Sequence, residues 1–158
     1  MPASCAVVFD AFHYHHWRLR WDSLVAHTTV EGGGPCPYKG AVTRSRGRGL
    51  TRNLVMRTEF ITYQRPSLAA ARMVGVSFPF TRWAASMKHE AAADGRSAMI
   101  YTYTIETGPP ALRWLMEPIV NRIFLRQTRQ RFARMQQFLA ANAAEVEAWQ
   151  RSTQQTKE

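Results

Sequence analysis

The histidines near the N-terminus are the first candidates for chemistry. His13, His15 and His16 form the densest group of side chains that could bind a metal ion or transfer a proton. On a helix His13 and His16 would share a face. A zinc site needs further ligands at a defined spacing, and no cysteine or carboxylate follows at such a spacing. We therefore predict structural or surface histidines, with no metal site and no cofactor.

Other catalytic signatures are also missing from the sequence. Asp22 lies close to Arg18 and Arg20, so a salt bridge to one of them explains it better than catalysis. Gly32-Gly33-Gly34 is followed by Pro35 and not by a helix with Lys and Ser or Thr, which argues against a nucleotide-binding loop. Residue order alone assigns no Ser-His-Asp or Cys-His group, because such partners meet only in space. The catalytic residues are unknown.

Aromatic and sulfur-containing residues are more numerous than a thin two-layer core requires. Small-molecule sites are built from apolar side chains with a few polar tips. We predict a cavity that binds a hydrophobic ligand and is lined by Trp17, Trp21, Met56, Phe60, Met73, Phe80, Trp83, Met87, His89, Tyr101, Tyr103 and Trp114. The expected polar tips are His89, Tyr101, Tyr103 and either Arg57 or Arg82.

A sheet is expected to position most of these residues. A short helix over 3–12 and a helix or turn over 13–22 come first. Alternating patterns and turn residues then predict six strands, over 24–30, 40–46, 54–63, 68–76, 81–90 and 97–107. The last strand has the clearest alternation, with Tyr101 and Tyr103 on one face and Thr102 and Thr104 on the other.

A long helix is predicted after Gly108-Pro109-Pro110 and extends to about residue 149, with Pro118 kinking or dividing it. Beyond the proline a stripe at helical spacing should lie on the sheet: Asn121, Leu125, Thr128, Phe132, Met135 and Leu139. Before it, apolar residues surround the helix, so this part should be buried on more than one side: Leu112, Trp114, Leu115 and Met116.

The composition is that of a globular protein. The 158 residues are 46% hydrophobic and 20% charged, which fits one domain over 1–150 with a polar, flexible tail over 151–158. No apolar run is long enough for a transmembrane helix, and the N-terminus lacks a signal-peptide pattern. Cys5 and Cys36 do not form a disulfide framework, so we expect thiols. These features predict a cytoplasmic protein.

The net charge of +10 reflects 21 Lys and Arg against 11 Asp and Glu. A basic balance favours anionic partners, but the arginines form no recognised nucleic-acid motif. We interpret most of them as a solvated surface and expect no specific nucleic-acid partner. The alternative is an interaction module in which Arg122, Arg126 and Arg129 meet an anionic partner.

The order of these elements resembles the SRPBCC superfamily, which includes START-type lipid-transfer domains and polyketide cyclase/dehydrase-like proteins. The matching residues are Val8-Phe9-Asp10, Trp21-Asp22, Gly40-Ala41-Val42, Tyr101–Ile105 and Arg131–Leu139. The resemblance covers residues 6–140. It implies an α+β helix-grip fold, in which a curved antiparallel β-sheet wraps around a long C-terminal α-helix, and a hydrophobic ligand such as a lipid or polyketide.

One departure from the superfamily affects assembly. Its members begin with a strand before the Val-Phe helix, whereas here only Met1–Ser4 precede it. The first strand is thus short or missing, which would leave the edge beside residues 97–107 unpaired. Exposed strand edges pair with other chains. We therefore expect a homodimer that uses this edge, the first half of the long helix, or both.

Two hypotheses about the cavity follow. The first is that it binds a hydrophobic or aromatic small molecule without catalysis. The second is an enzyme of cyclase, dehydratase or hydrolase type, with His89, Tyr101 or Tyr103 as acid or base.

Overall fold

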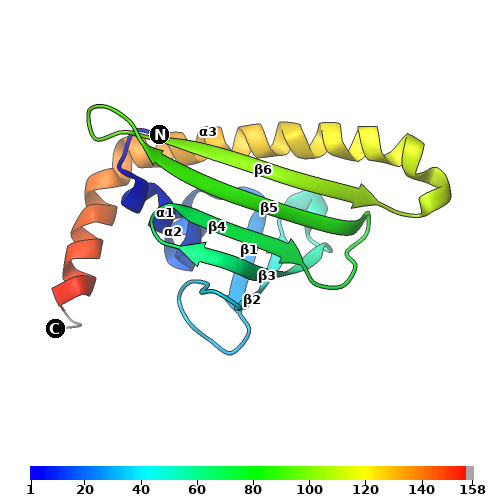
Figure 1. Cartoon of the computed structure of the whole chain (residues 1–158), viewed down its shortest axis with the longest axis horizontal. Helices are drawn as coiled ribbons and strands as arrows, with labels where there is room; N and C mark the ends of the chain where they lie inside the picture. Colours follow the sequence, from blue (N-terminus) through cyan, green and yellow to red (C-terminus); the bar gives the residue numbers. More distant parts are fainter. Residues whose placement is uncertain (156–158) are drawn as a thin grey trace.

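The fold is a curved antiparallel sheet packed against one long helix (Figure 1). The computed structural model describes residues 1–155, apart from the side chain of Leu50. Six strands follow one another in the order β1-β2-β3-β4-β5-β6, each antiparallel to its neighbours. They are β1 (Val25–Val30), β2 (Val42–Gly47), β3 (Val55–Gln64), β4 (Leu68–Met73), β5 (Phe80–Ala91) and β6 (Ser97–Thr107). The six predicted strands and the α+β helix-grip fold are confirmed.

Alternation along the strands separates the two faces of the sheet. In β6, Tyr101 and Tyr103 face the long helix, whereas Thr102 and Thr104 are exposed on the other side. Bulges interrupt the register in β1, β3 and β5, and a bulge bends the strand in which it occurs. The sheet thus curves, and its inner face forms one wall of the interior.

Two short helices precede the sheet: α1 (Cys5–His13) and α2 (His15–Trp21). The side chain of Ser4 accepts a hydrogen bond from the N–H of Val7 and caps α1, as its sequence suggests. α1 and α2 contribute aromatic and aliphatic side chains to the main core. There Val8 and Phe12 pack with Met135 and Leu139 of the C-terminal helix.

The C-terminal helix α3 spans Arg113–Gln155 and follows a 3₁₀ turn at Pro110–Leu112. Pro118 lies inside it and does not divide it. Thr128, Met135 and Leu139 are buried, as the predicted stripe requires. The helix continues beyond residue 149 into the segment predicted as a flexible tail, and residues 156–158 of that tail lie outside the described part of the chain.

The prediction that the first part of α3 is buried on more than one side is wrong. Trp114 is 76% exposed, Leu112 and Leu115 are also exposed, and Met116 is half-buried. This part of α3 contacts the sheet through one side only, where Tyr103 donates a hydrogen bond to Asn121 and packs against Phe124. The hydrophobic pattern here marks an apolar surface and not a core.

The edge next to β6 is nearly bare. Within residues 1–155 no strand precedes α1, and β6 has one neighbouring strand, β5. The backbone N–H and C=O of Ser97 bond with the backbone of Met1, and the Ser97 hydroxyl donates to the carbonyl of Ala3. Met1 therefore replaces the first strand at a single residue.

Candidate functional site

A cavity of about 200 Å³ lies between the inner face of the sheet, the end of α1, the middle of α2 and residues 124–131 of α3. Its apolar wall is formed by Phe12, Leu24, Val25, Leu54, Met56, Phe60, Ala69, Ala71, Phe80, Trp83, Ala85, Met87 and Phe124. The 3₁₀ turn Gly49–Thr51 closes on β2 beside it, where a Cβ at Gly47 would come within 2.5 Å of Thr51 Oγ1. The curved sheet and the helix that packs on it thus line a space suited to an apolar molecule.

Half of the predicted cavity residues line this space. They are Met56, Phe60, Phe80, Trp83, Met87 and Tyr101. All six come from β3, β5 or β6, where alternation places every second side chain on the inner face. Strand periodicity therefore located this wall of the cavity.

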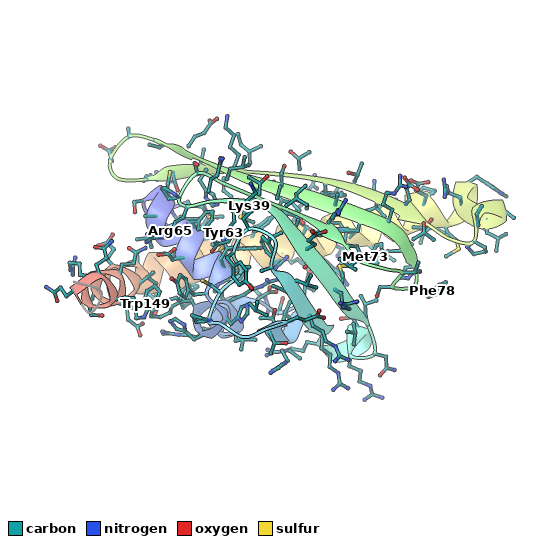
Figure 2. The ribbon with its side chains drawn as sticks, turned by 60° about the horizontal axis from the view of Figure 1, so that its bottom comes forward. Lys39, Tyr63, Arg65, Met73, Phe78 and Trp149 are labelled. Carbon is teal, nitrogen blue, oxygen red and sulfur yellow. The ribbon has the colours of Figure 1, made fainter. Side chains whose placement is uncertain are left out.

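The other six predicted residues lie elsewhere. Trp17 and Trp21 belong to the core between α2 and α3, and Trp21 Nε1 donates to the carbonyl of Ala11 at 2.9 Å. Tyr103 bonds Asn121, and Trp114 projects from α3 at the surface. The remaining two are His89, buried against Phe9, and Met73, which lies near Phe78 at the end of the sheet away from Tyr63 and Arg65 (Figure 2).

Three charged residues form a compact ion cluster beside the cavity, which we call the Arg–Asp–Arg cluster. Arg18 Nε lies 3.0 Å from Asp22 Oδ2, and Arg131 reaches the same oxygen with Nε at 3.0 Å and Nη2 at 2.6 Å. Asp22 also accepts a hydrogen bond from the N–H of Leu24 through Oδ1. The guanidinium groups of Arg18 and Arg131 lie over the ring of Phe12 at 5.0 and 4.9 Å.

The cluster is shielded from solvent. The exposed fractions of the side chains are 15% for Arg18, 11% for Arg131 and 0% for Asp22. Burial alone would raise the pKa of Asp22, but Arg131 and Arg18 outweigh it and hold the pKa below its usual value. Burial, followed by repulsion from Arg131, lowers the pKa of Arg18. An arginine nevertheless keeps its proton.

Two further titratable side chains of the wall, His13 and Tyr101, are neutral. His13 Nδ1 lies 2.8 Å from the carbonyl of Phe9, which can only accept, so the proton resides on Nδ1. Burial lowers the pKa of His13 to about 3. Burial also raises the pKa of Tyr101. Both side chains are therefore uncharged at neutral pH.

The polar side of the cavity differs from the one expected. Arg57 and Arg82 pair with Glu31 and Glu106 on exposed parts of the sheet and do not reach the cavity. A salt bridge from Asp22 to Arg18 or Arg20 was expected, and the partner is Arg18, whereas Arg20 pairs with Glu145. Arg131 lies 109 residues from Asp22. The sequence places it beside Phe132 of the sheet-facing stripe and in the segment Arg131–Leu139 that resembles the superfamily, but neither signal indicates a contact with Asp22.

Neither a metal centre nor a transmembrane element is seen in the described part of the chain. Among residues 1–155 no group of three or more His, Cys, Asp or Glu side chains is arranged to hold a metal ion. None of the described helices combines the length and hydrophobicity needed to cross a membrane.

Solved structures share this fold at low sequence identity. Ara h 8.0201 has a TM-score of 0.65 and 14% identity, with 89% of this chain and 93% of that chain covered. The di-domain ARO/CYC protein StfQ of the steffimycin biosynthetic pathway has a TM-score of 0.66 and 11% identity, with 90% of this chain and 49% of that chain covered. A norcoclaurine synthase point mutant from Thalictrum flavum, bound to a transition-state analogue, has a TM-score of 0.56 and 12% identity. The match covers 88% of this chain and 89% of that chain.

At these identities the likeness shows the fold alone. Comparison with curated protein sequences finds no match. A family model gives the decisive result: the model described as polyketide cyclase/dehydrase and lipid transport matches residues 1–147. This match agrees with the resemblance to the SRPBCC superfamily seen in the sequence. The chain belongs to the polyketide cyclase/dehydrase and lipid transport family.

Proposed function

We propose that the protein binds a hydrophobic, aromatic small molecule in the cavity between the sheet and α3. The observation that carries this proposal is the cavity of about 200 Å³ with its largely apolar wall. An apolar cavity of about 150 Å³ holds benzene. The space therefore fits a molecule of one or two rings better than a long lipid chain, and polyketides are rich in such rings.

The enzyme hypothesis has less support. General acid–base catalysis needs a titratable group within reach of the substrate. Of the three residues proposed for this role, Tyr101 alone lines the cavity, whereas His89 and Tyr103 do not. His13 lines it as well, but with a pKa of about 3 it is a poor base at neutral pH. We therefore favour binding without catalysis, and we infer that it takes place in the cytoplasm.

The binding proposal predicts that Ala85→Phe weakens ligand binding strongly. Ala85 lies on the inner face of β5 and lines the cavity, so a phenyl ring there would occupy the ligand's space. We expect the affinity for 2-naphthoate or its neutral amide, measured by isothermal titration calorimetry, to fall at least about tenfold.

The matched control for this experiment is Ala84→Phe. Ala84 is the neighbouring residue of β5, lies opposite Arg72 on the outer face of the sheet and does not line the cavity. It should retain the affinity of the unmodified protein. Equal affinities of both variants, or no binding of either probe by the unmodified protein, would disprove the proposal. Native mass spectrometry of protein purified from its own host would identify the natural ligand.

We also propose a homodimer built on β6 and the first half of α3. β6 is an edge strand, and two copies of one edge strand can pair antiparallel about a two-fold axis. Beside it, Trp114, Ile119 and Ile123 are 76%, 53% and 52% exposed. Contiguous apolar surface of this kind is typical of an interface.

The dimer should dissociate when charge is placed on this surface. We expect the unmodified protein to sediment as a dimer at micromolar concentration and Trp114→Glu/Ile119→Glu to sediment as a monomer. Gln136→Glu/Gln137→Glu adds the same charge at exposed positions further along α3 and should remain dimeric. A monomeric unmodified protein would refute this proposal.

A further inference from the structure

We propose that the ligand carries an anionic group, of the carboxylate type, and that Arg18 and Arg131 bind this group at the wall of the cavity. This inference rests on the proposed binding function and specifies the ligand's chemistry. Its basis is the imbalance of charge in the Arg–Asp–Arg cluster.

The cluster holds two positive charges and one negative charge. Both arginines line the cavity, whereas Asp22 does not and is fully buried behind them. Two guanidinium groups and one carboxylate leave a net charge of +1. A buried charge is costly unless a partner compensates it. An anionic ligand would supply that partner.

The rest of the cavity wall adds no negative charge. The lining residues of the described chain include no Asp or Glu. A third arginine, Arg46, lines the cavity from β2, and its Nε donates to the backbone carbonyl of Arg52. The wall is thus apolar and positively charged, which suits an aromatic acid and disfavours a cation.

The two guanidinium groups also retain donors for a ligand. A guanidinium has five N–H groups. Arg18 gives its Nε–H to Asp22, and Arg131 gives one N–H from Nε and one from Nη2. Stacking on Phe12 holds both groups beside each other. The terminal nitrogens of Arg18 and Nη1 of Arg131 are therefore available to bind carboxylate oxygens, which form strong charge-assisted hydrogen bonds with arginine.

A matched pair of probes tests the inference. 2-Naphthoate and 2-naphthamide have nearly the same shape and differ in charge. Calorimetry at neutral pH should show that the protein binds the acid at least about tenfold more tightly than the amide, the factor expected for a charge-assisted contact.

Two variants and one control test whether Arg18 and Arg131 bind the anionic group. Arg131→Gln and Arg18→Gln each leave one arginine paired with Asp22, so neither strands a buried charge. Each should weaken binding of the acid about tenfold and leave binding of the amide nearly unchanged. The control is Arg126→Gln, which removes the same charge from an exposed position on α3 and should bind both probes like the unmodified protein.

The outcomes separate this inference from the proposed function. Equal or tighter binding of the amide, or acid binding that neither Arg131→Gln nor Arg18→Gln weakens, would overturn the anionic ligand while leaving a hydrophobic ligand in place. Failure of both probes to bind would overturn the proposed function and this inference with it.

Discussion

Asp22→Asn is expected to lower the free energy of unfolding by about 3 kcal/mol. Asp22 is fully buried and bonds both Arg18 and Arg131. The amide would leave two guanidinium groups side by side in the interior with no carboxylate between them. Removing one partner of a buried ion pair usually costs about 3 to 5 kcal/mol. We place the effect at the lower end because the cavity gives both arginines some access to water.

Urea unfolding at neutral pH measures this loss. Glu145→Gln is the control, because it removes a carboxylate that pairs with Arg20 on the exposed surface, and it should not change stability measurably. Asp22→Asn/Arg131→Gln should recover part of the loss, since it removes one of the two uncompensated charges. If Asp22→Asn were as stable as the unmodified protein, the cluster would not be the stabilising unit that its geometry indicates.

The sequence was most informative where the signal is local. The strands follow from alternation and from turn residues, both of which act within a few residues. The pair of Arg18 and Asp22 follows from helical spacing in the same way. Six cavity residues on β3, β5 and β6 were accessible for the same reason, since their face is set by strand periodicity.

Features that depend on distant parts of the chain could not be predicted in this way. Arg131 reaches Asp22 only because α3 crosses the inner face of the sheet, so its role depends on the complete fold. The burial predicted for Trp114 was wrong for a related reason. Its neighbours on α3 are hydrophobic, as the sequence shows, but the sheet does not cover that part of the helix, so Trp114 is exposed. An apolar pattern does not distinguish a core from an interface.

Buried histidines should make the protein sensitive to mild acid. Burial lowers the pKa of His13 to about 3 and that of His89 to about 4, whereas an unfolded chain titrates near the ordinary value of 6.5. Below about pH 6.5 the unfolded state therefore binds more protons than the folded state, and stability falls as the pH falls. Between about pH 7 and pH 5 the two residues together should cost roughly 4 kcal/mol of unfolding free energy.

This pH window differs from that of Asp22. The pKa of Asp22 is lowered in the folded state, so its contribution is present above its ordinary pKa of 3.8 and is lost only at more acidic pH. Loss of stability between about pH 7 and pH 5 thus reports on the histidines and not on the ion cluster.

His89→Leu should remove one part of this acid sensitivity. His89 is 4% exposed, and neither ring nitrogen has a hydrogen-bond partner in the described structure, so an apolar side chain of similar volume should cost nothing at neutral pH. At about pH 5 the variant should be more stable than the unmodified protein by roughly 1 to 2 kcal/mol, since it has no imidazole to protonate on unfolding. Urea unfolding at both pH values measures the difference.

Met87→Leu is the control. It changes a buried neighbour on the same face of β5 without removing a titratable group, so its pH dependence should match that of the unmodified protein. An unchanged pH dependence in His89→Leu would mean that the imidazole becomes protonated equally well in both states, and burial would then not be the cause of the acid sensitivity at this position.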